Sequence, residues 1–279
     1  MMIDDKDLKS VTDYSEGQKE AAYSVLGEVV NILSPFAEDM RIVGGWVPSL
    51  LYQDQDHIGS IDVDVLLNQL NIEKKDGYAT ILELLRNNGY TRHPDPKKYF
   101  TYIKQVEIDG VAYTVDVDLL SGMYGGAGGS VSKHIDGIKA LPATGGNFAF
   151  DFPAEDVTIQ YRRPDGAKDI GHVKVVAVVP YLVMKAAAMG RGKPKDAYDI
   201  YFCLTNYEGG VRALAETFAP YRDAGLVKEM RNKLAEKFMS PDHAGPADIV
   251  SFLDIHDDEE IAQVKQDAYQ RVKYLLDRL

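Results

Sequence analysis

The stretch RIVGGWVPSLLYQDQDHIGSIDVDVLL, residues 41–67, joins a glycine pair to two aspartates that are one residue apart. Residues 41–43 predict a short strand, and Gly44-Gly45 turns the chain into a helix that carries Pro48 near its start. Residues 60–68, SIDVDVLLN, alternate polar and apolar side chains and then become apolar, which predicts another strand. The stretch therefore predicts a strand, a glycine turn, a helix and a strand in an α/β arrangement.

The two aspartates are expected on one face of the second strand. Side chains alternate along a strand, so Asp62 and Asp64 point one way while Ile61, Val63 and Val65 point toward the core. Two carboxylates at one edge repel each other unless a cation lies between them, and Mg²⁺ prefers oxygen ligands of this kind. Because solvated Asp-x-Asp pairs are also common on exposed strands, this motif alone leaves both interpretations open.

A second acidic pair occurs in VAYTVDVDLL, residues 111–120, where Asp116 and Asp118 share a face. The preceding strand, residues 99–108, is connected to it through Ile108-Asp109-Gly110, a typical hairpin turn. If residues 111–120 pair with residues 60–68, carboxylates from two strands converge at one sheet edge, which favours a metal over solvated aspartates.

Gly44 and Gly45 have two interpretations of their own. Glycines at a strand-to-helix turn let backbone N–H groups approach a phosphate, with the helix N-terminus behind them. A tight turn that needs positive φ is the structural alternative. The carboxylates that begin 17 residues after Gly45 favour the phosphate interpretation.

Residues 180–204, PYLVMKAAAMGRGKPKDAYDIYFCL, predict two helices with a break at residues 190–193. The second helix begins at Pro194, with Lys195 and Asp199 on the face opposite its apolar stripe, four residues apart and able to pair. Solvated ion pairs explain this pattern. The functional alternative is a phosphate site: Lys185, Arg191 and Lys195 reach a triphosphate while Asp196 or Asp199 orients a base, a hydroxyl or a basic side chain.

Composition predicts a folded cytoplasmic protein. The sequence is 45% hydrophobic, has one cysteine, and begins with an acidic, polar segment that does not resemble a secretory signal. The longest apolar run, residues 175–184, is broken by Pro180 and too short for a membrane span. The net charge is −12, yet residues 158–200 contain 8 Lys/Arg against 4 Asp/Glu, which suits a local anion site better than broad nucleic-acid coating.

The expected fold class is α/β (α+β), a small mixed sheet flanked by helices and followed by a mostly helical part. We expect the first domain at residues 1–150 and the helical domain at residues 151–279. The glycine-rich segment GMYGGAGGS, residues 122–130, lacks the Lys-Ser/Thr ending of a phosphate loop, which favours a flexible connection.

Taken in order, these motifs resemble the nucleotidyltransferase superfamily, which has the polymerase-β-like fold. The resemblance rests on hydrophobic-Gly-Gly, a short helix, Asp-x-Asp on the next strand and a third aspartate on a later strand. The helical segment looks like that of AbiEii-type nucleotidyltransferases, in which a lysine precedes Arg-x3-Lys-Asp-x2-Asp. The matching residues here are Lys185, Arg191, Lys195, Asp196 and Asp199, and the resemblance covers residues 40–205.

The resemblance implies Mg²⁺- or Mn²⁺-dependent transfer of an NMP from an NTP, such as ATP, to an acceptor hydroxyl. Metal would be bound by Asp62, Asp64 and a third carboxylate, Asp118 in preference to Asp116. Gly44, Gly45 and Ser60 would contact phosphates together with the helical cations. The acceptor would be a tRNA 3′ end, a protein or a small molecule, and the family includes toxins that act with an antitoxin partner.

One departure separates this chain from the family. An Arg often stands shortly before the Asp-x-Asp, whereas this chain has His57-Ile58-Gly59-Ser60. Ser60 can donate to a phosphate, and His57 is either a substitute for the Arg or an ordinary surface residue. The missing Arg also permits an alternative, a nucleotide-binding protein of the same fold that is weakly active or inactive. A glycosyltransferase that uses Asp-x-Asp is disfavoured because no Rossmann-like βαβ pattern is present.

Overall fold

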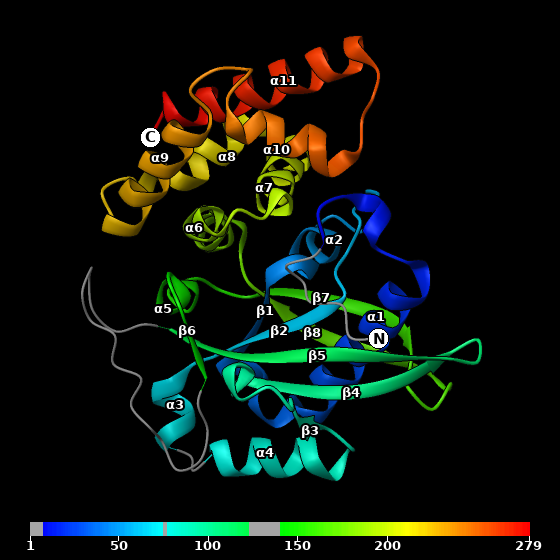
Figure 1. Ribbon diagram of the computed structural model, residues 1–279. Helices are drawn as coiled ribbons and strands as arrows, with labels where there is room; N and C mark the ends of the chain where they lie inside the picture. The colour runs from blue at the N-terminus through cyan, green and yellow to red at the C-terminus, as the bar shows by residue number, and fades with distance from the viewer. Residues whose placement is uncertain (1–7, 75–76, 123–139) are drawn as a thin grey trace.

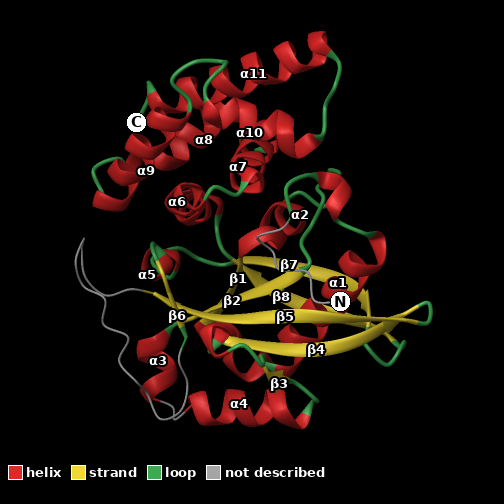
Figure 2. Ribbon diagram, in the orientation of Figure 1, coloured by secondary structure: helices red, strands yellow, loops and turns green. Residues whose placement is uncertain are grey.

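The computed structural model describes residues 8–74, 77–122 and 140–279, and its centre is one mixed β-sheet (Figures 1 and 2). The strand order is β3-β4-β5-β2-β1-β8-β7, with β6 paired to β5. β2 runs parallel to β5 and β1 runs parallel to β8, whereas β1 and β2 are antiparallel. The strands are β1 (Met40–Val43), β2 (Asp62–Leu67), β3 (Thr91–Arg92), β4 (Thr101–Ile108), β5 (Val111–Gly122), β6 (Leu141–Ala143), β7 (Glu155–Arg162) and β8 (Lys168–Val175).

Helices flank this sheet, and most of them belong to the C-terminal half. α1 packs along β4, β5, β7 and β8, while α6 to α11 gather above the sheet in Figure 1 and α4 lies below it. The helices are α1 (Glu16–Ile32), α2 (Val47–Leu51), α3 (Gln69–Lys74), α4 (Gly77–Asn87), α5 (Gly146–Ala149), α6 (Val178–Ala188), α7 (Pro194–Asn206), α8 (Gly210–Phe218), α9 (Gly225–Lys237), α10 (Ala244–Leu253) and α11 (Asp258–Leu276). The mixed α/β class expected from the sequence is thus confirmed.

The sheet extends further along the chain than the sequence suggested. β7 and β8 belong to the same sheet as β1, so residues 155–175 are part of the sheet and not of a mostly helical domain. The helical part begins with α6 at Val178, and the expected boundary at residue 150 therefore falls before the last two strands. The sheet is also larger than expected, with eight strands among the described residues. The glycine-rich segment from residue 123 onward lies outside those residues.

The local elements follow their sequence signals closely. Asp109 and Gly110 have φ values of 49° and 79° between β4 and β5, which is the turn that the Asp-Gly pair predicts. Val63 and Val65 of β2 are fully buried, as the alternation requires. The side chain of Ser15 accepts a hydrogen bond from the backbone N–H of Gln18, and this cap fixes the start of α1. No helix among residues 8–74, 77–122 and 140–279 is long and apolar enough to cross a membrane.

Candidate functional site

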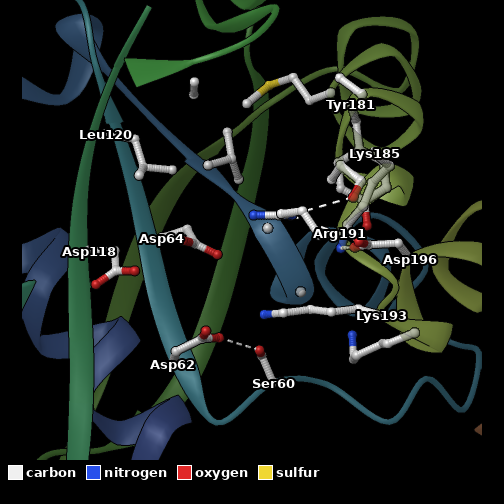
Figure 3. A pocket seen from close by; sticks show the side chains of 18 of the residues that line it. Ser60, Asp62, Asp64, Asp118, Leu120, Tyr181, Lys185, Arg191, Lys193 and Asp196 are labelled. Carbon is white, nitrogen blue, oxygen red and sulfur yellow. Dashed lines mark hydrogen bonds and ion pairs between the residues drawn. The ribbon is translucent and has the colours of Figure 1, made fainter. Parts of the chain in front are cut away.

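A cavity of about 440 Å³ lies between the sheet and the helices α6 and α7. Figure 3 shows aspartates on the strand side of this cavity and basic side chains on the helix side. Its lining includes Gly44, Gly45, Ser60, Asp62, Asp64, Asp118, Lys185, Arg191, Lys193, Lys195 and Asp196. Motifs that are separated by more than 100 residues in the sequence thus meet around one space.

The strand side of the cavity is set by the pairing of β2 with β5. Asp62 lies opposite Asp116, and Asp64 lies opposite Asp118, on neighbouring parallel strands. The predicted convergence of the two acidic pairs is therefore confirmed. Asp118 lines the cavity, whereas Asp116 does not and instead accepts a hydrogen bond from Lys98 Nζ at 2.8 Å. This favours Asp118 as the third carboxylate.

Asp118 is a mostly buried carboxylate among other acids. Burial, together with the charges of Asp62 and Asp116, raises its pKa from 3.8 to about 7, although Thr101 and Lys98 act in the opposite direction. Thr101 Oγ1 donates a hydrogen bond of 2.6 Å to Asp118 Oδ1. Asp118 therefore exchanges a proton near neutral pH, and any cation that approaches this wall would favour its ionised form.

The glycine turn is packed directly against the aspartates. Gly44 has a φ of 72°, and a Cβ there would overlap the carboxylate of Asp64. A Cβ on Gly45 would come within 2.5 Å of Ser60 Oγ and 3.2 Å of Lys195 Nζ. Trp46 Nε1 donates to the carbonyl of Asp62 at 2.8 Å, which ties the turn to β2. A side chain at Gly44 or Gly45 would collide with these groups. The close approach of this backbone to the Asp64 carboxylate and the Lys195 ammonium group therefore needs glycine.

Ser60 connects the turn to the first aspartate. Its hydroxyl donates a hydrogen bond of 2.5 Å to Asp62 Oδ1, and both residues line the cavity. In the structure as it stands, Ser60 therefore orients a carboxylate. It remains within the cavity wall, where its oxygen can also face an incoming phosphate.

The helix side of the cavity contains buried ion pairs in place of the solvated pairs that the helical pattern suggested. Lys195 pairs with Asp199 as predicted, at 2.9 Å, but Lys195, Asp196 and Asp199 are all buried. Lys185 Nζ lies 2.9 Å from Asp196 Oδ1 and 2.7 Å from Asp199 Oδ2. The pairs are buried and not solvated because α6 packs on α7. The periodicity of one helix does not reveal which neighbour covers its polar face.

These pairs fix the charge states of their members. Burial alone would raise the pKa of Asp199, but Lys185, Lys195 and a hydrogen bond from His57 hold it well below its usual range. Burial likewise opposes the charge of Lys185, and Asp196 and Asp199 overcome it and keep its pKa above the usual value. Lys185 is thus positively charged, and both lysines are already paired with carboxylates.

His57 is neither a surface residue nor a cation of the cavity wall. Its side chain is fully buried, and its Nε2 lies 3.0 Å from Asp199 Oδ1. Burial is the main cause that lowers its pKa from 6.5 to about 4, and the lysines Lys195 and Lys185 contribute. The imidazole is therefore neutral at physiological pH and does not replace the missing Arg.

The more exposed cations of the helix side are at the break between α6 and α7. Arg191 lines the cavity with its side chain 61% exposed, and its Nη2 lies 3.8 Å from Asp196 Oδ2. Lys193 also lines the cavity and extends toward Ser60 and Asp62 in Figure 3. Lys193 was not singled out from the sequence, although its place in the Gly-Arg-Gly-Lys-Pro break, residues 190–194, is the signal that could have indicated it.

The carboxylate wall fits a hard divalent cation by the chemistry of its donors. Asp62, Asp64 and Asp118 offer the oxygen ligands that Mg²⁺ and Mn²⁺ take. The raised pKa of Asp118 reflects burial first and the charges of Asp62 and Asp116 second, and a cation would favour the ionised form against both. Within the part of the chain that the structure describes, no three His, Cys, Asp or Glu side chains are already close enough together to enclose an ion.

No protein-family model matches the chain, and no curated protein or solved structure is detectably similar to it.

Proposed function

We propose that this protein is a Mg²⁺-dependent nucleotidyltransferase that moves an NMP from an NTP to an acceptor hydroxyl. The observation that carries the proposal is the two-sided cavity, in which Asp62, Asp64 and Asp118 face a wall of lysines and Arg191. An NTP needs both sides, because its phosphates are bound by cations on the protein and by a metal that carboxylates hold. The glycine turn between the two sides offers backbone N–H groups at close approach.

The positions of the basic residues in segment 158–200 favour a nucleotide as the ligand over a long nucleic acid. Of the eight Lys/Arg in residues 158–200, Lys185, Arg191, Lys193 and Lys195 line the cavity. The others, Arg162, Arg163, Lys168 and Lys174, belong to the hairpin of β7 and β8 and its turn. Positive charge is therefore concentrated where a polyphosphate would lie, while the chain as a whole carries −12.

In the proposed reaction an acceptor oxygen attacks the α-phosphorus, the bond to the bridging oxygen breaks, and pyrophosphate leaves. Mg²⁺ or Mn²⁺, held by Asp62, Asp64 and Asp118, would supply charge neutralisation for the phosphates. Asp118 would accept the proton of the attacking hydroxyl at Oδ2, since Thr101 occupies Oδ1. Ser60 keeps Asp62 oriented through its hydrogen bond. Arg191 and Lys193 would stabilise the negative charge that develops on the leaving pyrophosphate.

The acceptor is proposed by class. An RNA 3′ end such as that of a tRNA, a protein hydroxyl and a small molecule all supply the required nucleophile. The resemblance to AbiEii-type proteins suggests that the chain acts as the toxin of a toxin–antitoxin pair.

A second candidate function is a nucleotide-binding protein without efficient turnover. The observation that favours it is the commitment of Lys185 and Lys195 to Asp196 and Asp199. A triphosphate would have to compete with these carboxylates for both ammonium groups, which weakens the phosphate site relative to one with free lysines.

Label transfer from α-³²P-labelled NTPs separates the two candidates. Each NTP is incubated with Mg²⁺ or Mn²⁺ and with total tRNA or cell extract, for the wild type and an Asp62→Asn/Asp64→Asn variant. The matched control is Asp54→Asn/Asp56→Asn, another Asp-x-Asp pair with the same substitutions on an exposed segment. Transfer that disappears only in the first variant supports the enzyme, and NTP binding without transfer supports the second candidate. An absence of both in the wild type contradicts the proposal.

A further inference from the structure

His57 occupies a closed position between the sheet and the helical part. It lies on the segment between α2 and β2, and its ring stacks on Tyr198 with 5.2 Å between centroids and an angle of 13°. Phe202, one turn later on α7, contacts the ring edge-on at 4.7 Å. The imidazole thus packs against α7 on the segment that leads directly to Ser60.

Hydrogen bonds fix the tautomer of this ring. The backbone N–H of Gly59 donates to His57 Nδ1 at 3.1 Å, so Nδ1 carries no hydrogen. The hydrogen of the neutral ring is then on Nε2, which donates to Asp199 Oδ1 at 3.0 Å. Gly59 has a φ of 78°, and a Cβ there would press on the Trp46 ring at 2.9 Å, so this backbone geometry needs glycine.

Asp199 connects the His57 ring to both lysines of the cavity. It is fully buried and does not line the cavity, while Lys185 and Lys195 do. Its Oδ1 accepts from His57 and Lys195, and its Oδ2 lies 2.7 Å from Lys185 Nζ. If the His57 donor is lost, Asp199 keeps only the lysines and Tyr181 as partners and can turn toward them.

We propose that His57 is a positioning residue, whose neutral ring holds Asp199 so that the ammonium groups of Lys185 and Lys195 face a triphosphate. The inference rests on the proposed function for the identity of the anion, and it differs from the role of a substitute Arg. His57 does not line the cavity, and it acts on the two lysines through Asp199. The same contacts hold the segment that carries Ser60 against α7. His57 therefore connects the two elements that form opposite walls of the cavity.

Two substitutions separate positioning from packing. His57→Phe keeps the ring between Tyr198 and Phe202 and removes both hydrogen bonds, whereas His57→Gln restores a donor toward Asp199. Tyr201→Phe is the matched control, because it removes a 2.8 Å hydrogen bond to Asp267 from the same helix, away from the cavity. Calorimetry with inorganic tripolyphosphate measures the phosphate site without any requirement for transfer.

We expect His57→Phe to weaken tripolyphosphate binding by about tenfold or more, as the loss of a hydrogen bond to a charged group predicts. His57→Gln should stay within about threefold of the wild type, and Tyr201→Phe should match it. Nitrogen-15 NMR of the wild type should show the Nε2–H tautomer of His57. Equal binding by His57→Phe and wild type, no binding by the wild type, or an Nδ1–H tautomer would each overturn the inference. Wild-type binding without label transfer would instead contradict the proposed function alone.

Discussion

Asp64 lies directly opposite Asp118, on two parallel strands that are neighbours in the sheet although 54 residues separate the pair in the sequence. This relationship brings the two acidic motifs to one wall of the cavity. Burial, together with the charges of Asp62 and Asp116, raises the cost of ionising Asp118. The carboxylates are thus held together by the fold despite their mutual repulsion, which is the arrangement that a divalent cation stabilises.

Asp118 and Asp116 should differ sharply as Asn variants. Asp118→Asn removes a carboxylate from the cavity wall, and we expect label transfer to fall by about 100-fold or more. Asp116→Asn lies two residues away on the same strand but outside the cavity, where it binds Lys98, so transfer should change by less than about threefold. Initial rates with a saturating NTP and Mg²⁺ measure both, and equal losses would contradict the assignment of Asp118.

The same Asp118→Asn variant should be more stable than the wild type without metal at pH 8. The folded-state pKa of about 7 exceeds the ordinary 3.8, so the ionised carboxylate destabilises the fold as the pH rises through this interval. The neutral amide removes this penalty, and we expect the free energy of unfolding to rise by about 1–3 kcal/mol. Urea unfolding with EDTA measures the change, and Mg²⁺ should stabilise the wild type more than the variant. A variant less stable than the wild type at pH 8 would show that Asp118 carries no such penalty.

Gly44→Ala should destroy the site through a clash and not through backbone strain alone. A Cβ at Gly44 would overlap the carboxylate of Asp64, whereas one at Gly110 has no atom within 4 Å. Both glycines have positive φ, so Gly110→Ala reproduces the backbone cost of about 1 kcal/mol without the clash. We expect Gly44→Ala to lose NTP binding and Gly110→Ala to retain it, as measured by calorimetry at matched folded fraction. Normal binding by Gly44→Ala would rule out a close approach of the phosphates to this turn.

Lys185 and Arg191 should differ in how much their loss changes the stability of the fold. Lys185→Met leaves Asp196 and Asp199 without one of their counter-charges in a buried site, which costs about 3–5 kcal/mol of unfolding free energy. Arg191→Met removes a side chain that is 61% exposed and should change stability by less than about 0.5 kcal/mol while weakening tripolyphosphate binding. Denaturant unfolding and calorimetry on both variants test this contrast, which would fail if Lys185→Met were as stable as the wild type.

Stability should fall in mildly acidic solution because of His57. Its folded-state pKa of about 4 lies below the ordinary 6.5, so the unfolded chain takes up this proton first. The free energy of unfolding therefore decreases as the pH falls from about 6.5 to about 4, by at most about 3 kcal/mol, and this contribution is constant above that interval. His57→Gln should show a flatter pH dependence over the same interval. Asp118 titrates in both proteins and cancels in the difference, so parallel curves would contradict the shifted pKa.

Much of the fold could be predicted from local sequence signals. The alternation in SIDVDVLL and YTVDVDLL fixes which side chains share a strand face, because a strand repeats every two residues. The Asp-Gly pair fixes the hairpin between β4 and β5, and Pro194 marks the start of α7. Strands β7 and β8 join the same sheet as β1, which local signals do not indicate because a strand sequence does not specify the sheet that it joins.

What the sequence determined by itself is the set of chemical groups and their local faces: Asp62 with Asp64, Asp116 with Asp118, and Lys195 four residues before Asp199 on α7. What the tertiary structure decided is which of them meet and which are buried. Strand pairing brought the two acidic motifs together, with Asp118 in the cavity wall and Asp116 outside it, hydrogen-bonded to Lys98. The packing of α6 on α7 buried the ion pairs of α7. His57 gained its role in the same way, since burial and a hydrogen bond to Asp199 depend on an element 142 residues away.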